Sequence, residues 1–216
     1  MRKYRSSRCP CRACCTSSVS LRLSYTLLAP FYDFFVGPAF AAARRTSLAA
    51  LPRDGGLRVL VNGVGSGLDL PLLPRGHAYV GLDLTRAMLE RCRQRTVKLE
   101  FAAVQGNSLA LPFRNSSFDY AVLHLILAVV PDAARALAET ARVVRPGGGI
   151  LVFDKFLKSG QRAVLRRLLN PVAARVATRL DVVFEDALAQ APSLSIVSDE
   201  PAAAGGWFRL IRLQKA

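Results

Sequence analysis

The chain has 216 residues, of which 51% are hydrophobic and 8% aromatic. This length and composition exclude a disordered or fibrous chain and predict a globular domain with a buried core. The formal net charge of +15 at pH 7 predicts attraction to anionic partners such as phospholipid or nucleic acid, although charge alone names no partner.

We expect residues 1–22 to form a basic, cysteine-rich leader without stable structure, and residues 23–216 to form one domain. The leader contains the motif CPCRACC, which holds four of the chain's five cysteines. A tetrahedral metal site made from four thiolates of so short a loop would be strained, and no second CxxC or histidine pair stands at zinc-like spacing. We therefore predict no metal site. Lipid acylation of these cysteines and a start codon assigned too early are the alternatives.

The apolar stretch LSYTLLAPFYDFFVGPAFAAA, residues 23–43, superficially resembles a secretory signal. Pro30, Asp33 and Pro38 interrupt it, whereas a membrane-spanning helix needs about 20 uninterrupted apolar residues. We expect an amphipathic segment that covers a cofactor site or touches a membrane surface. The corresponding location is cytoplasmic, with peripheral binding at the inner membrane face as an option.

Apolar runs rich in β-branched residues then alternate with helical patterns, which is typical of parallel βαβ units. The predicted strands span residues 57–63, 78–84, 99–106, 118–127 and 149–157, with closing strands at 194–201 and 206–216. Apolar steps of three and four residues predict helices over 86–96 and 133–144 and a shorter one after Gly67. Pro146 and the three glycines behind it predict a turn before the fifth strand.

This order of elements predicts an α/β fold. We expect a Rossmann-like, doubly wound, mostly parallel sheet of about seven strands with helices on both faces. A basic, leucine-rich helix is expected after residue 160.

The first predicted strand ends in a glycine loop, VLVNGVGSGLDLPLL, residues 59–73. Gly63, Gly65 and Gly67 permit a tight turn and a close approach of the backbone to a ligand. A glycine turn that merely packs a helix on the sheet explains the pattern alone equally well.

Asp83 ends the second predicted strand, 20 residues beyond Gly63. A carboxylate at this place accepts hydrogen bonds from both hydroxyls of a ribose, in dinucleotide enzymes and in methyltransferases alike. The alternative is that Asp83 caps the helix that begins near Thr85.

Motifs in chain order then separate these two classes. They are VGSGLDLPLLP, GLDLTRAMLERC, VQGNSLALPFRNSSFDYAVLHL and RVVRPGGGILVFD. With these motifs the chain resembles the class I S-adenosylmethionine-dependent methyltransferases, in the group that holds quinone methyltransferases and bacterial phosphatidylethanolamine N-methyltransferases. The resemblance covers about residues 24–157.

The resemblance implies S-adenosyl-L-methionine as the cofactor. The cofactor-binding residues that it implies are Gly63, Gly65, Gly67, Asp83, Leu84, Met88, Asn107, Ser108, Leu125 and Tyr32. The glycines would wrap the amino-acid part of the cofactor, and Asn107 stands where the family has the aspartate that accepts a hydrogen bond from the adenine amino group. Tyr32 lies in FYDFF, which is similar to the family's N-terminal segment that covers the cofactor; a plain hydrophobic lid is the alternative.

One position departs from the family pattern. Where the family commonly has an acid at the end of the first strand, this chain has Val61 followed by Asn62. The usual carboxylate near the cofactor's ammonium group is therefore missing. We expect that Asn62 or Asp69 takes over part of its role, or that the chain is a catalytically silent relative.

Methyl transfer from a sulfonium mainly requires alignment of the acceptor with the methyl carbon. His124 is the candidate catalytic residue, as a base for an acceptor that must lose a proton, because histidine titrates near neutrality. The alternative is a packed histidine that is hydrogen-bonded to the backbone.

The acceptor is expected to be a small molecule or lipid, either a phospholipid headgroup or a quinone. Five arginines after residue 160 suit an acceptor at an anionic membrane surface, or simply a solvated helix face. They are Arg162, Arg166, Arg167, Arg175 and Arg179. The absence of a recognisable RNA-binding module argues against a nucleic-acid acceptor. The alternatives in other classes are a silent cofactor- or membrane-binding relative and a nicotinamide-dependent oxidoreductase.

Overall fold

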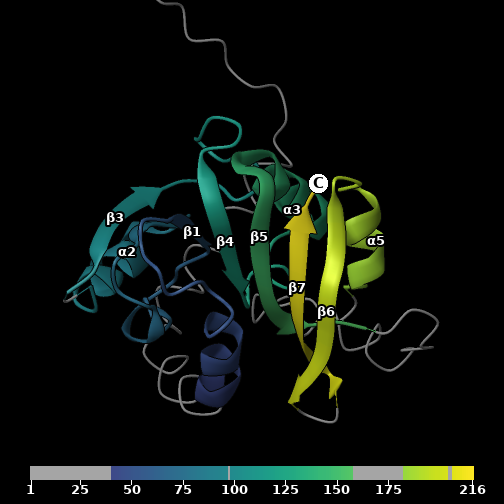
Figure 1. The fold of residues 1–216 in the computed structure, drawn as a ribbon, viewed down its shortest axis with the longest axis horizontal. Helices are drawn as coiled ribbons and strands as arrows, with labels where there is room; N and C mark the ends of the chain where they lie inside the picture. The colour runs from purple at the N-terminus through teal and green to yellow at the C-terminus, as the bar shows by residue number, and fades with distance from the viewer. Residues whose placement is uncertain (1–39, 97, 158–181, 204–205) are drawn as a thin grey trace, which may run out of the picture.

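A seven-stranded sheet forms the centre of the protein (Figure 1). The computed structural model describes residues 40–96, 98–157, 182–203 and 206–216. The strands are β1 (Arg58–Asn62), β2 (Ala78–Asp83), β3 (Glu100–Gln105), β4 (Phe118–His124), β5 (Val144–Lys155), β6 (Leu194–Ala203) and β7 (Phe208–Lys215). Their order in the sheet is β3-β2-β1-β4-β5-β7-β6, and only β7 runs antiparallel to its neighbours. The predicted Rossmann-like, mostly parallel sheet is confirmed.

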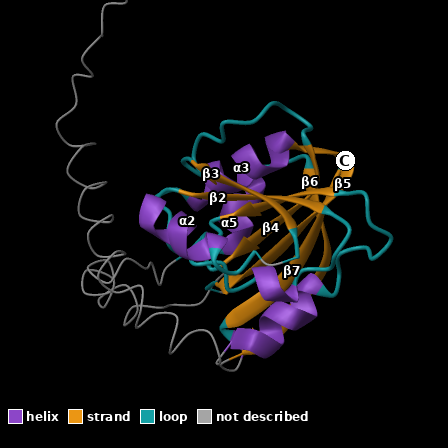
Figure 2. Ribbon diagram, turned by 90° about the vertical axis from the view of Figure 1, so that its left-hand side faces the viewer, coloured by secondary structure: helices purple, strands orange, loops and turns teal. Residues whose placement is uncertain are grey.

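Helices cover both faces of this sheet (Figure 2). Val59 and Val61 of β1 face a core shared with α2 (Arg86–Arg93) and with the helix of residues 40–48. Leu60, between them, faces the core under α3 (Ala133–Val143) and α5 (Phe184–Ala189). Because both faces are buried, the central strands are apolar without alternation, which explains why they stand out in the sequence.

The helix of residues 40–48, dark blue in Figure 1, lies at the carboxyl ends of the parallel strands. Its first residue, Phe40, packs its ring against Phe153 of β5 and Phe208 of β7, at centroid distances of 5.5 and 4.5 Å. This contact places the polar side chains later in the helix at the edge where parallel sheets bind ligands.

The short helix predicted after Gly67 is present, whereas the start predicted for the fifth strand is wrong. The crossover after Gly67 contains only a single turn of 3-10 helix, η1 (Leu70–Leu72), because Pro74 holds Leu73 in an extended conformation and cannot continue a helix. The turn predicted at Pro146 does not separate helix from strand, since α3 passes directly into β5. The extra residues form an irregularity in which the pairing of β5 with β4 shifts between Val144 and Gly149.

Several sequence features lie outside the described residues: the cysteine motif of residues 9–15, Tyr32 and the basic helix predicted after residue 160. The predicted boundary between the leader and the domain, at residue 22, also lies outside the described residues. In the part of the chain that the structure does describe, no helix is long and apolar enough to cross a bilayer.

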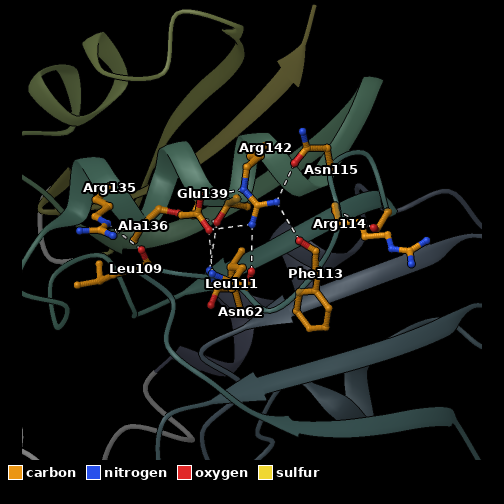
Figure 3. Close-up of polar contacts among 12 residues, drawn as sticks. Asn62, Leu109, Leu111, Phe113, Arg114, Asn115, Arg135, Ala136, Glu139 and Arg142 are labelled. Carbon is orange, nitrogen blue, oxygen red and sulfur yellow. Dashed lines mark hydrogen bonds and ion pairs between the residues drawn. The ribbon is translucent and has the colours of Figure 1, made fainter. Parts of the chain in front are cut away.

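Side chains of α3 fix the loop between β3 and β4 (Figure 3). Arg142 donates hydrogen bonds to the carbonyls of Leu111 and Phe113, at 3.0 and 2.9 Å. Glu139 pairs with Arg142 and accepts a hydrogen bond from the N–H of Leu111 at 2.8 Å. Since Asn107 lies in the same loop, α3 sets the position of a predicted cofactor-binding segment.

We expect Arg142→Met to destabilise the protein by roughly 1–3 kcal/mol, because the loop carbonyls lose their charged donor. The measurement is urea unfolding followed by circular dichroism. Arg114→Met is the matched control, since Arg114 is an exposed arginine of the same loop. Equal unfolding midpoints for both variants would contradict the anchoring role of Arg142.

Candidate functional site

A cavity lies at the carboxyl ends of β1, β2 and β4, where the strand order reverses direction. Most of the predicted cofactor residues line it: Gly63, Gly65, Asp83, Leu84, Met88, Asn107, Ser108 and Leu125. The candidate base His124 lines it as well. The sequence therefore located this cavity through residues that come from four separate segments of the chain.

The glycines of the loop have different roles. Gly65 lines the cavity with a φ of 55°, and a side chain added there would meet no protein atom closer than the carbonyl oxygen of Gly63 at 4.0 Å. Its missing side chain thus keeps space free for a ligand. Gly67 is not among the lining residues. A Cβ at Gly67 would lie 3.2 Å from Cys92 of α2, so this glycine serves the packing of the helix.

Asp83 is held in a fixed orientation at the end of β2. Its two carboxylate oxygens accept hydrogen bonds from the backbone N–H groups of Gly65 and Thr85, at 3.0 and 2.8 Å. Burial raises the pKa of Asp83, and these backbone bonds offset part of the rise. Thr85 itself is the N-cap of α2, so Asp83 does not cap this helix. Asp83 also lines the cavity, so its carboxylate is accessible to the hydroxyls of a ligand.

Four buried polar side chains form a continuous chain beside the cavity. Asp69, the N-cap of η1, accepts hydrogen bonds from Arg44 at 2.6 Å and from Nδ1 of His124 at 2.9 Å. Nε2 of His124 lies 2.9 Å from the hydroxyl of Ser47. All four side chains belong to residues less than 9% exposed. These four hydrogen-bonded side chains join the helix of residues 40–48 to η1 and to the end of β4.

This arrangement determines the charge of Asp69 and places a proton on Nδ1 of His124. Burial alone would raise the pKa of Asp69, but His124 and Arg44 together lower it to about 2. An ionised Asp69 can only accept hydrogen bonds, so Nδ1 of His124 carries a proton and donates to it, while Nε2 shares a hydrogen bond with the hydroxyl of Ser47. His124 as the base stays a prediction, with the added condition that Ser47 must leave Nε2 before the ring takes a proton there.

The sequence singled out Asp69 and His124 but missed Arg44 and Ser47. The available signal was weak: Arg44 and Ser47 stand three positions apart, which puts both on one face of a helix, but they are the ends of a run of four polar residues in an alanine-rich segment. No pattern in the sequence joins that face to Asp69, 25 residues from Arg44.

Asn62 does not occupy the cavity. It is fully buried, donates a hydrogen bond to the hydroxyl of Thr140 in α3 at 3.1 Å and accepts one from Ser108 at 2.7 Å. The Asn62 amide therefore joins β1 to α3 and to the following loop. Of the two candidates for the missing carboxylate, Asp69 lines the cavity and Asn62 does not.

The cavity residues fit the cofactor that the resemblance implies. Arg44 lines the cavity, and its buried Nε has no hydrogen-bond partner among the described residues. This guanidinium could bind the carboxylate of the methionine part, while Asp83 suits the ribose hydroxyls. The side-chain oxygen of Asn107 accepts the N–H of Leu109 at 2.9 Å and keeps a lone pair for an adenine amino group.

Comparisons with known proteins agree with this geometry. A family model described as "Methyltransferase domain" matches residues 60–152. The chain is 32% identical to a phosphatidylethanolamine N-methyltransferase of Cereibacter sphaeroides over 189 residues, which is 85% of this chain and 92% of that protein. A demethylmenaquinone methyltransferase of Staphylococcus epidermidis is 41% identical over 75 residues, 34% of this chain and 31% of that protein.

A solved structure shows the same fold. Geranyl diphosphate C-methyltransferase from Streptomyces coelicolor, in complex with Mg²⁺, geranyl diphosphate and S-adenosyl-L-homocysteine, has a TM-score of 0.68 at 14% identity. The superposition covers 82% of this chain and 78% of that chain.

We expect Asp83→Asn to weaken the binding of S-adenosyl-L-homocysteine about tenfold or more, because an amide removes the charge and one of the acceptors. Isothermal titration of the purified chain measures this. Asp119→Asn is the matched control, since Asp119 lies near the start of β4, outside the cavity lining, and pairs with Arg145 of β5. Unchanged affinity of the Asp83 variant would refute the ribose role.

The low pKa of Asp69 predicts a specific loss of stability in acid. The ordinary value of 3.8 falls to about 2 in the folded protein, so the contribution is fully present above about pH 4 and is lost as the pH falls toward 2. Its size is roughly 2 kcal/mol. Urea unfolding between pH 5 and 2 should show a shallower decline for Asp69→Asn than for the unmodified chain.

The exposed Asp54→Asn variant serves as the control and should keep the full slope. An equally steep decline for Asp69→Asn would show that the ion pairs of Asp69 do not stabilise the fold.

Proposed function

Because the chain belongs to the class I S-adenosylmethionine-dependent methyltransferases, we propose that it methylates the amine of a phospholipid headgroup. The observation that carries this proposal is the extent of the match to the phosphatidylethanolamine N-methyltransferase, which runs over 85% of this chain and 92% of the relative. A match of this extent includes segments on both sides of the shared methyltransferase region of residues 60–152. Those flanking segments are where acceptor specificity is expected to lie.

The apolar side of the cavity supports a lipid-like acceptor. Leu84, at one end of the cavity, is a large hydrophobic residue that remains 37% exposed. The loop after β4 adds four apolar side chains to the lining, namely Ile126, Val129, Val130 and Pro131. Such a surface favours apolar parts of an acceptor and excludes water from the reacting groups.

Alignment is the main task of the protein in this reaction. When bound, S-adenosyl-L-methionine supplies a methyl group on a sulfonium, which is a good leaving group for an in-line displacement. Asp83 would fix the ribose and Arg44 the carboxylate, so that the methyl group has one defined direction in the cavity. Holding two reactants in the productive geometry contributes several kcal/mol to catalysis.

His124 is suited to remove the proton of an ammonium acceptor. A proton taken up at Nε2 would give an imidazolium whose other N–H group faces the Asp69 carboxylate, 2.9 Å away. Such a pair stabilises the charge that develops on the ring, as an aspartate does for a catalytic histidine elsewhere. The hydroxyl of Ser47 would have to rotate away from Nε2 first.

A quinone is the second candidate acceptor. The 41% identity to a demethylmenaquinone methyltransferase supports it, but the match covers only 75 residues. The family assignment leaves the nicotinamide-dependent alternative without support.

The test is an assay of the full chain with S-adenosyl-L-methionine labelled in the methyl group. The acceptors are vesicles that contain phosphatidylethanolamine, vesicles of phosphatidylcholine alone, and a demethylated menaquinone in the same vesicles. We expect label in monomethylated phosphatidylethanolamine, identified by mass spectrometry, and at least about tenfold less with Asp83→Asn.

Label in the quinone alone would replace the first proposal by the second. If neither acceptor is labelled although the protein binds S-adenosyl-L-homocysteine, both proposed acceptors are wrong.

A further inference from the structure

A second cavity lies beside the cofactor cavity and shares two of its walls. The helix of residues 40–48 presents Arg44 to the cofactor cavity and the next residue, Arg45, to the second one. In the same way, the segment around η1 places Asp69 in the first cavity and Leu72 in the second. The two cavities are therefore lined by neighbouring residues of the same two segments.

The lining of this second cavity is basic and aliphatic. Three arginines, Arg45, Arg53 and Arg75, stand over Leu48, Leu51 and Leu72 in a space of about 550 Å³. We call it the arginine groove. Its size falls within the range of small-molecule sites.

The three arginines are exposed and unneutralised. None of them forms an ion pair or a side-chain hydrogen bond with any residue that the structure describes. Other arginines of the protein are paired, as Arg142 is with Glu139 and Arg209 with Asp199. A cluster of unpaired guanidinium groups in one cavity favours an anionic occupant, above all one with phosphate oxygens.

Positive charge excludes two possible occupants of the groove, the leader of this chain and a second copy of it. The leader of this chain cannot neutralise the groove, since residues 1–32 contain six basic residues and no acid. A second copy of the chain carries the same net charge of +15 and would be repelled. The occupant must come from another, anionic source.

The floor of the groove favours lipid over nucleic acid. Single-stranded nucleic acids bind by stacking their bases on aromatic side chains. The groove offers none, only leucine, alanine and proline beside its arginines. Leu48 and Leu51 are core residues only 2% exposed, so Leu72, Ala49 and Pro74 supply the apolar surface, which suits the glycerol part of a lipid, while the arginines at the rim suit its phosphate.

We propose that the arginine groove docks the headgroups of anionic phospholipids and so holds the cofactor cavity against a bilayer. The apolar, aromatic residues 23–39 directly precede the helix that carries Arg45, which agrees with a membrane-facing side of the molecule. Docking is independent of the acceptor, whereas its benefit for catalysis rests on the proposed function.

The experiment is co-sedimentation of the full chain with vesicles of phosphatidylcholine, with and without phosphatidylglycerol. We expect binding only to the anionic vesicles, and about a hundredfold weaker binding for the triple variant Arg45→Gln, Arg53→Gln, Arg75→Gln. The control carries Arg93→Gln, Arg114→Gln and Arg212→Gln, which removes the same charge from exposed positions elsewhere. Its binding should fall by less than about fivefold.

The same variants are titrated with S-adenosyl-L-homocysteine, whose affinity should not change. Unchanged cofactor affinity with lost vesicle binding separates this proposal from the methyltransferase assignment. If the triple variant unfolds, Arg75→Gln alone is used, with an expected loss of about fivefold.

Three results would overturn the proposal. Equal losses in both triple variants would mean that the groove is only part of a diffuse basic surface. Full vesicle binding by the groove variant would assign docking to another segment. If the groove variant lost binding to single-stranded RNA but still bound vesicles, the groove would be a nucleic-acid site.

Discussion

The site depends on one buried carboxylate. Asp69 is 4% exposed and remains ionised because Arg44 and His124 both donate hydrogen bonds to the same oxygen. Taking a charge out of water is costly, and only close, well-oriented partners offset that cost. Since the partners come from the helix of residues 40–48 and from β4, this requirement holds three segments together. These contacts of Asp69 therefore hold in place the wall of the cavity beside the glycine loop.

The other end of the cavity has a separate support. Asn62 connects β1 with Thr140 and Ser108, and α3 fixes the adjoining loop through Arg142. The end of β1 therefore carries a neutral amide that serves the fold instead of a carboxylate that faces the ligand. Within the cavity, the carboxylate of Asp69 at the start of η1 is paired with the guanidinium of Arg44.

The sequence was sufficient for the fold and for about half of the site. Alternation of apolar runs and helical patterns indicates which elements are buried, and the spacing from Gly63 to Asp83 predicts two residues that the structure brings to one cavity. Both depend on order along the chain, which the sequence displays directly. The contacts of Arg44 with Asp69 and of Ser47 with His124 span 25 and 77 residues, and hydrophobic periodicity contains no record of such pairs. The short helix predicted after Gly67 is a single 3-10 turn, because Pro74 prevents its continuation.

The position of β7 has a consequence for biosynthesis. β7 follows β6 in the chain but lies between β5 and β6 in the sheet. A nascent chain that has emerged only as far as β6 has nothing to pair with it, and the apolar edge of β5 stays open until β7 leaves the ribosome. Open strand edges are the usual templates for wrong pairing. The edge of β5 is therefore open to wrong pairing during the interval between its own synthesis and that of β7.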